Sequence, residues 1–337
     1  MGMKLDAERM LRMFETMTRI REFDERAARL MEQARVPGSV HLYCGEEAIA
    51  VGVCEALRPD DYITSTHRGH GHLLAKGGDA ERMFAELFAK PTGYNRGRGG
   101  SMHIAALELG MIGANGIVAA GAPIALGVAF ASAYQENERV TICFFGDGAA
   151  NEGAFHEAMN MASVLKAPMV FVCENNGYGE WSPANTQSNI EDIADRAHGY
   201  GIPGVVVDGM DVVAVHEAAG HAIARARSGE GPTLLECKTY RFYDHVGRNF
   251  GVLDRPAEEE AYWRSKDPIT AWRKILIEQK VSTAKKLDAI TAKICAELDA
   301  AIEHTEQQPN PEPAELMDGV YTNPPSALST KDSEVGA

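Results

Sequence analysis

Three absences in the sequence exclude broad classes of protein. The chain of 337 residues contains no run of about eighteen apolar residues, and its first residues lack the apolar core of a signal peptide. We therefore expect a soluble, cytoplasmic protein without a membrane segment. An excess of basic residues is also missing, since 33 Lys and Arg stand against 48 Asp and Glu and the net charge is −15. Nucleic acid is accordingly not an expected partner.

Cysteine pairs with metal-binding spacing are absent as well. None of the six cysteines belongs to a C-x-x-C pattern, and Cys143 and Cys173 lie inside apolar runs. We interpret the cysteines as reduced core residues and expect no zinc site. What the chain does have is 45% hydrophobic residues, which is enough to build one large core.

Hydrophobic patterns divide the chain into three parts. We predict an N-terminal helix within residues 1–40, an α/β domain over 41–305 and a Pro-rich tail over 306–337. Apolar residues at three-residue steps after Asp6 indicate a long amphipathic helix that Asp6 caps. Alternating strand-like and helical runs between about 110 and 240 are typical of a parallel sheet with helices on both faces. Helices are expected again at about 268–304.

Two strand-like runs end in residues suited to a metal ion. Val140–Phe145 leads into Gly146-Asp147-Gly148, and Met169–Cys173 leads into Glu174-Asn175-Asn176. In a βαβ unit, Asp147 and Asn176 would lie at the carboxyl ends of neighbouring parallel strands, where open sheets bind ligands. A carboxylate and an amide oxygen suit Mg²⁺, which commonly bridges to phosphates, and the start of the intervening helix favours an anion. The sequence therefore predicts a metal–diphosphate site.

Other interpretations of these residues stay open at this stage. Gly146-x-Gly148-x-x-Asn151 partly matches a dinucleotide-binding fingerprint, but Asn151 stands where the third glycine belongs. The same residues also suit a simple turn. In Thr66–His72, three histidines and an arginine among glycines favour an anion-binding loop. A transition-metal site there is disfavoured because no carboxylate or thiolate is adjacent.

Five ordered motifs resemble the alpha subunit of the thiamine-diphosphate-dependent E1 component of 2-oxo acid dehydrogenase complexes, which include pyruvate and acetoin dehydrogenases. The motifs are Gly99-Gly-Ser-Met-His103, Gly113-Ala-Asn-Gly-Ile-Val118, Gly146-Asp-Gly-Ala-Ala-Asn151, Glu174-Asn-Asn-Gly-Tyr-Gly179 and Val207-Asp-Gly-Met-Asp211. The resemblance implies the diphosphate-binding half of the thiamine-diphosphate-binding α/β fold. It also implies an oxidoreductase with a lipoyl acceptor, and thiamine diphosphate and Mg²⁺ as cofactors.

The resemblance further implies how the metal and the diphosphate are held. Asp147, Asn176 and the backbone oxygen of Tyr178 would hold Mg²⁺. Gly148 and Ala149 would present backbone N–H groups to the diphosphate.

Other positions of the family's pattern concern the rest of the cofactor and the catalytic groups. His67 and Arg68 stand where a Tyr-Arg pair contacts the diphosphate, and Gly116 and Val118 would line the aminopyrimidine. The expected catalytic histidines are the one in a mobile loop over about 241–256, beside the thiazolium, and two near the entrance: His245, His70 and His103.

The resemblance also implies partners and a substrate class. In the family, the glutamate that activates the aminopyrimidine belongs to the beta subunit, so we expect an α₂β₂ assembly, with no turnover by this chain alone, and a lipoyl-bearing E2 acyltransferase. His67 replaces the tyrosine usual in pyruvate enzymes, which favours acetoin over pyruvate, with branched-chain 2-oxo acids third. A non-catalytic diphosphate-binding homologue is the alternative. Val246-Gly247-Arg248-Asn249 offers no serine to a kinase.

Overall fold

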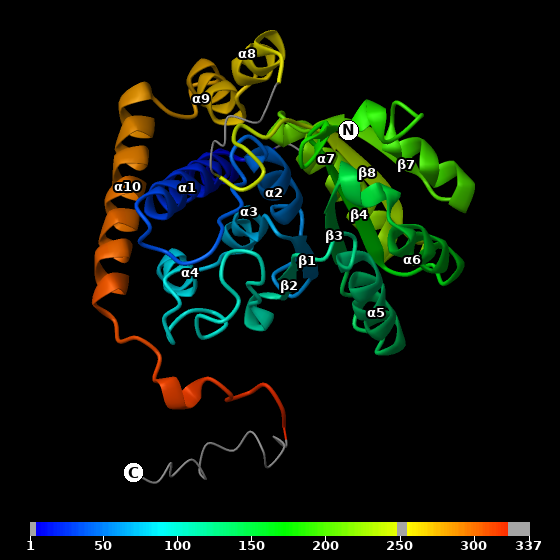
Figure 1. The fold of residues 1–337 in the computed structure, drawn as a ribbon. Coiled ribbons are helices and arrows are strands. Elements are labelled where there is room, and N and C mark those ends of the chain that lie inside the picture. Colours follow the sequence, from blue (N-terminus) through cyan, green and yellow to red (C-terminus); the bar gives the residue numbers. More distant parts are fainter. Residues whose placement is uncertain (1–4, 248–254, 323–337) are drawn as a thin grey trace.

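A six-stranded parallel sheet forms the centre of the computed structural model, which describes residues 5–247 and 255–322 (Figure 1). All its strand pairs are parallel, and their order is β2-β1-β3-β4-β8-β7. The strands are β1 Tyr62–Thr66, β2 Met111–Asn115, β3 Thr141–Gly146, β4 Met169–Asn175, β7 Gly204–Asp208 and β8 Thr233–Lys238, and a separate short hairpin is made of β5 Tyr178–Gly179 and β6 Ser182–Pro183. The predicted fold class is confirmed.

Ten α-helices and five short 3₁₀ helices surround this sheet within the described residues. The α-helices are α1 Ala7–Glu32, α2 Glu47–Cys54, α3 Gly69–Ala75, α4 Ala80–Leu87, α5 Gly121–Tyr134, α6 Gly153–Val164, α7 Val212–Arg227, α8 Ala257–Ser265, α9 Pro268–Glu278 and α10 Ala284–Gln307. The 3₁₀ helices are η1 Leu107–Leu109, η2 Asp147–Asn151, η3 Ala184–Thr186, η4 Ile193–Tyr200 and η5 Pro313–Glu315. Over the same described ranges, no helix combines the length and apolarity needed to cross a membrane.

The two faces of the sheet belong to two hydrophobic cores, because successive side chains of a strand point to opposite faces. In β3, Ile142 and Phe144 pack with residues of α1, α2, α7 and α10 in the larger core. Cys143 and Phe145 pack with α5, α6 and η4 in the smaller one. Both faces of the central strands are therefore covered by helices, as the apolar runs predict.

The first helix and the last helices share the larger core with the sheet. Asp6 caps α1, because its carboxylate accepts the N–H of Arg9 at 2.8 Å. The indole of Trp272 in α9 donates to the carbonyl of Met10 at 3.0 Å, and α10 runs along α1 and α4 (Figure 1). These contacts hold α9 and α10 against α1.

Several segments differ in detail from their sequence pattern. After Gly146 the chain makes the 3₁₀ turn η2, which the sequence did not predict, and α6 then begins at Gly153. Helix α8, at Ala257–Ser265, lies in a stretch where no helix is predicted. Of the predicted loop over 241–256, residues 248–254 lie outside the described part of the chain, as does 323–337 of the predicted tail. Residues 309–322 form an arm below the body (Figure 1).

The strand order reverses between β1 and β3. The chain runs outward from β1 to β2 on one side and from β3 to β4 on the other. The loops that follow these strands therefore leave the sheet in opposite directions and open a crevice at its carboxyl edge. Ligands of open α/β sheets bind at such a switch point.

Candidate active site

A cavity of about 370 Å³ opens at this switch point. Four loops line it, one after each of the strands β1, β2, β3 and β4, together with the segment around 241–245. Every residue predicted to contact the cofactor or the metal lies in its wall: His67, Arg68, Gly116, Val118, Asp147, Gly148, Ala149, Asn176, Tyr178 and His245. Side chains that are far apart in the sequence thus converge on one cavity.

The predicted metal ligands form an oxygen-donor set. Asp147 is only 5% exposed, and burial raises the pKa of its carboxyl to about 6, although Arg241 opposes this shift. The side-chain NH₂ of Asn176 donates to Glu46 at 2.8 Å, while its oxygen accepts the N–H of Tyr178 at 3.1 Å. A buried carboxylate and an oriented amide oxygen fit a hard cation such as Mg²⁺, which would offset the cost of burying the charge.

Buried arginines give the cavity its anion-binding wall. The guanidinium of Arg68 donates to the carbonyls of Leu42 at 2.8 Å and His245 at 2.9 Å. Arg241 is also buried, and its pKa is lowered to about 9 by burial and by the positive charges of Arg68 and Arg255. Cations that repel one another in a buried site are stabilised by a polyanion. A diphosphate fits this wall.

Backbone geometry explains the glycines in the cavity wall. A Cβ on Gly148 would stand 3.2 Å from the Cα of Gly179, so the two loops meet where neither has a side chain. Ala119, in the loop after β2, has a φ of 64°, a left-handed conformation that is costly for an alanine. The loop is thus held in a shape that its own residues do not favour.

Three imidazole rings face one another in the cavity wall. The ring centroids of His41, His67 and His245 lie 4.9 to 5.1 Å apart. Burial, followed by the charge of Arg68, lowers the pKa of all three, to about 3 for His41 and His245. Arg68 donates to Nδ1 of His245 at 3.1 Å, so the ring proton of His245 is on Nε2. The cluster is therefore neutral at pH 7.

Two of the predicted histidines lie outside the cavity. His70 is fully buried beneath it, with Nδ1 2.7 Å from Asp24 and Nε2 3.0 Å from the hydroxyl of Ser101. His103 is exposed, and its ring lies against the loop after β2, because a Cβ on Gly116 would come 3.1 Å from it. Neither histidine contributes to the cavity wall, so their catalytic roles stay predictions.

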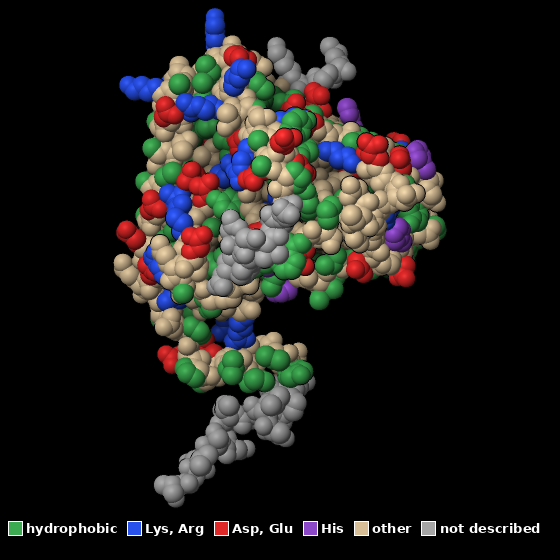
Figure 2. Space-filling view, turned by 45° about the horizontal axis from the view of Figure 1, so that its top comes forward, with side chains coloured by type: hydrophobic (Ala, Val, Ile, Leu, Met, Phe, Trp, Pro, Cys, Tyr) green, Lys and Arg blue, Asp and Glu red, His purple; other side chains and the backbone are tan. Residues whose placement is uncertain are grey.

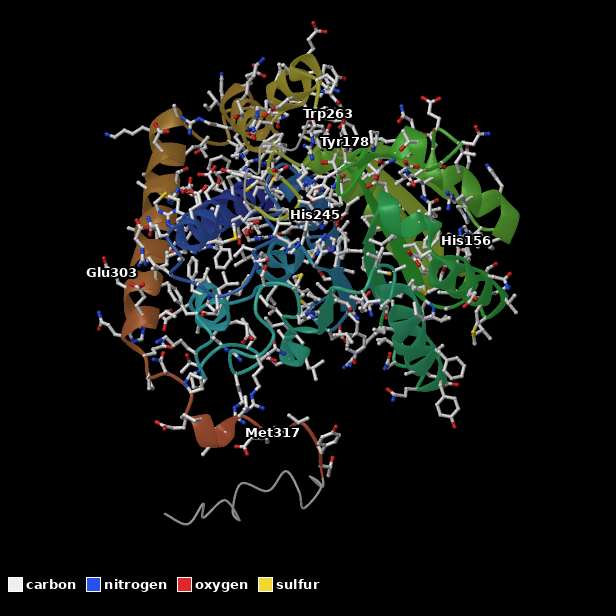
Figure 3. The ribbon with its side chains drawn as sticks, in the orientation of Figure 1. His156, Tyr178, His245, Trp263, Glu303 and Met317 are labelled. Atoms are coloured by element: carbon white, nitrogen blue, oxygen red, sulfur yellow. The ribbon has the colours of Figure 1, made fainter. Side chains whose placement is uncertain are left out.

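Several residues in the wall were not predicted as site residues, among them the ionisable side chains of His41, Glu46 and Arg241. His41 and Glu46 lie in the segment between α1 and α2, where periodicity carries no information. Two features of the sequence could have indicated these residues. His41 is a lone histidine in the apolar run Val40–Cys44, and Glu46 is one of two adjacent glutamates before an apolar helix. Labelled side chains in Figure 3 show Tyr178 and His245 on the side of the sheet where the cavity opens, and His156 away from it on α6.

The parallel sheet, its switch-point cavity and the paired oxygen donors and arginines are typical of α/β proteins that bind a metal ion together with a diphosphate. The family model described as "Dehydrogenase E1 component" matches residues 15–314. This chain belongs to the dehydrogenase E1 component family, as an alpha subunit of the acetoin and pyruvate dehydrogenase type. It is an oxidoreductase component with a lipoyl acceptor, in a family that generally uses thiamine diphosphate and Mg²⁺.

The chain is similar over nearly its whole length to curated relatives. It is 47% identical to the alpha subunit of acetoin:2,6-dichlorophenolindophenol oxidoreductase of Bacillus subtilis, over 96% of each chain. Identity to the protein of the same name from Cupriavidus necator is 43%, over 96% of this chain and 97% of the relative. The pyruvate dehydrogenase E1 alpha subunit of Porphyra purpurea is 39% identical, over 93% of this chain and 92% of its own length.

Proposed function

We propose that this chain is the alpha subunit of a cytoplasmic acetoin dehydrogenase E1 component, with pyruvate as the second candidate substrate. It would form an α₂β₂ assembly with a beta subunit and pass an acetyl group to the lipoyl group of an E2 acyltransferase. The observation that carries this proposal is that the residues of the cofactor motifs line a single cavity at the switch point of the sheet.

The cavity residues have distinct tasks toward the cofactor. Asp147, Asn176 and the carbonyl of Tyr178 would hold Mg²⁺, while Arg68 and the N–H groups that start η2 would hold the diphosphate. When bound, thiamine diphosphate supplies a nucleophilic carbon and an electron sink for breaking a C–C bond next to a carbonyl. The buried wall excludes water and orients these groups, which is the contribution of the protein.

Neutral imidazoles suit the proton movements of acetoin cleavage. Because Nδ1 of His245 accepts from Arg68, its Nε2–H is free to donate to a substrate oxygen. Nδ1 of His41 is buried and makes no hydrogen bond to any described residue, and the ring lines the cavity. The cavity wall therefore contains one oriented donor and one imidazole with an unpaired ring nitrogen.

Acetoin and pyruvate differ in the group that leaves. Acetoin and a lipoyl disulfide give acetaldehyde and S-acetyl dihydrolipoyl, whereas pyruvate gives CO₂ and the same thioester. Release of acetaldehyde requires that a base take the hydroxyl proton, whereas release of CO₂ requires none. An unpaired imidazole in the wall, and the higher identity to the two acetoin relatives, support acetoin.

Apolar surface beside the cavity supports a partner subunit. Helix α5 contains no charged residue, and α5 packs against α6. Large apolar side chains stay exposed before and along these helices: Ile117, Val118, Ile124, Phe130, Tyr134, Met161, Val164 and Leu165. Val118 also lines the cavity, so this surface starts at the cavity mouth. A beta subunit that covered it would complete the site and bury a patch unusual for a monomer.

The arm offers a second apolar surface to a partner. Its exposed hydrophobic residues are Leu316, Val320 and Tyr321, and Figure 2 shows hydrophobic side chains along this arm below the body. Arg98 donates to the carbonyl of Glu315 at 2.6 Å and to that of Asp318, which ties the arm to the Gly-rich loop of residues 95–103.

Reconstitution tests the proposed function. The chain, combined with its beta subunit, Mg²⁺ and thiamine diphosphate, is expected to acetylate a lipoyl domain faster from acetoin than from pyruvate. Without the beta subunit, we expect no turnover. His245→Ala should reduce acetylation steeply and leave cofactor affinity unchanged, because His245 contacts the substrate and Arg68 still holds the diphosphate. Magnesium-independent cofactor binding, or turnover by this chain alone, would contradict the proposal.

A further inference from the structure

Glu46 lies deep in the cavity wall without belonging to the predicted metal ligands. It is the residue before helix α2 and is 1% exposed. Its side chain does not cap α2, since no hydrogen bond joins it to the first turn of that helix. The carboxylate instead reaches across to the end of β4, where Oε1 accepts from the side-chain NH₂ of Asn176 at 2.8 Å.

This contact fixes which way the Asn176 amide faces. An amide has a donor end and an acceptor end, and their assignment follows from their partners. The donor end of Asn176 meets an oxygen of Glu46, which accepts hydrogen bonds, while its acceptor end meets the N–H of Tyr178 at 3.1 Å. Both partners agree on one orientation. The amide oxygen keeps a second lone pair, and Asn176 lines the cavity.

Asn176 is the one hydrogen-bond partner of the Glu46 side chain within the described part of the chain. Its second oxygen, Oε2, is buried and makes no hydrogen bond there. A buried carboxylate with one unpaired oxygen costs stability, and it makes no ion pair that would explain its position. Glu47, the next residue, is different: Arg21 and the N–H of Gly45 bind its carboxylate, which stabilises the fold away from the cavity.

We propose that Glu46 is a positioning residue of the metal site, which holds the Asn176 amide with its oxygen toward the cation. The inference deepens the proposed function and rests on it, because it requires a metal at Asp147 and Asn176. Groups that orient metal ligands are typically worth about 10–100-fold in metal affinity, and we expect an effect of this order. Glu46 acts through Asn176, so its effect should vanish when Asn176 is removed.

Two substitutions separate the hydrogen bond from the charge. Glu46→Ala removes the acceptor and should weaken Mg²⁺ binding about 10–100-fold. Glu46→Gln keeps an oxygen that accepts from Asn176, so its Mg²⁺ affinity should be closer to that of the wild type than to that of Glu46→Ala. Affinity is measured by calorimetric titration of Mg²⁺ into the chain reconstituted with its beta subunit, at saturating thiamine diphosphate. Circular dichroism on the same samples checks that each variant is folded.

A matched control and a double variant complete the test. Glu47→Gln alters a neighbouring buried carboxylate that does not contact Asn176, so it should lower stability and leave Mg²⁺ affinity unchanged. In the Asn176→Ala background, Glu46→Ala should change affinity by less than about twofold. Wild-type affinity in a folded Glu46→Ala would overturn the inference, as would equal losses in Glu46→Ala and Glu46→Gln. Failure of the wild type itself to bind Mg²⁺ would reject the proposed function instead.

Discussion

Ser101→Ala should destabilise the protein and shift the cavity wall, because Ser101 closes a buried ring of hydrogen bonds. Its hydroxyl accepts the N–H of His41 at 3.2 Å and faces Nε2 of His70 at 3.0 Å. Nδ1 of His70 lies 2.7 Å from Asp24, whose second oxygen accepts the N–H of Tyr43. The ring joins α1, the 41–43 segment, α3 and the Gly-rich loop.

The geometry also gives the size of the effect and the position of one proton. Since the Asp24 carboxylate can only accept, the single ring proton of a neutral His70 lies on Nδ1, and Nε2 then accepts the hydroxyl proton of Ser101. Ser101→Ala leaves two buried groups unpaired, each worth about 1–3 kcal/mol, so we expect a loss of about 2–6 kcal/mol. Entry of a water molecule would bring the loss toward the lower end.

Urea unfolding and ¹⁵N NMR of the histidines measure these two quantities. A matched control is Thr18→Val on α1, because Thr18 is buried with a hydroxyl that makes no hydrogen bond to the described residues. Its replacement by an apolar residue of the same shape should be neutral or stabilising. A loss below about 0.5 kcal/mol in Ser101→Ala, or a proton found on Nε2 of His70, would refute the reasoning.

Further predictions concern the imidazole cluster, one helix cap, the Gly-rich loop and the apolar surface. Folding lowers the pKa of His41 and His245 from 6.5 to about 3. As the pH drops from 6.5 toward 3, the unfolded chain therefore binds protons before the folded chain does, and the free energy of unfolding should fall. Urea titration at each pH measures this change. Asp211→Ala removes the acceptor for two N–H groups at the start of α7 and should cost about 1 kcal/mol in the same assay. Glu86→Gln places a side-chain NH₂ against backbone N–H groups of the Gly-rich loop, so it should lower the midpoint temperature of thermal unfolding. An unchanged midpoint would show that the loop does not need the carboxylate. Phe130→Asp on exposed α5 should abolish association with the beta subunit in size-exclusion chromatography and leave the unfolding curve unchanged.

The sheet and most of the cofactor residues could be predicted because local patterns decide them. Apolar runs that end in Gly146-Asp147-Gly148 or in Asn175-Asn176 place these residues after strands, and a parallel sheet brings strand ends together. The loop residues then need only the correct strand order to meet in one cavity. The resemblance to a family supplied their roles, which spacing alone did not.

The histidines show what a local pattern cannot decide. His67, His70 and His72 are equivalent in the sequence, yet only His67 lines the cavity. His70 turns to Asp24 on α1, and His72 lies between Ser65 and Glu174. Each ring direction depends on a partner from a distant element, and that partner is known only once the helices have packed. His41 and Glu46 were missed for the same reason.

Buried polar groups outside the cavity determine the shape of its wall. Glu86 of α4 accepts the N–H groups of Asn95, Gly97, Gly99 and Gly100, so a flexible Gly-rich loop takes one conformation. In that conformation the hydroxyl of Ser101 lies within hydrogen-bond distance of His70 and accepts the backbone N–H of His41, which fixes His41 in the cavity wall. The side chains of Glu86, Ser101 and His70 are buried and hydrogen-bonded in this arrangement, which makes alternatives costly. A site formed by flexible loops is therefore preorganised by carboxylates and hydroxyls that never contact the ligand, and a substitution there should alter catalysis as well as stability.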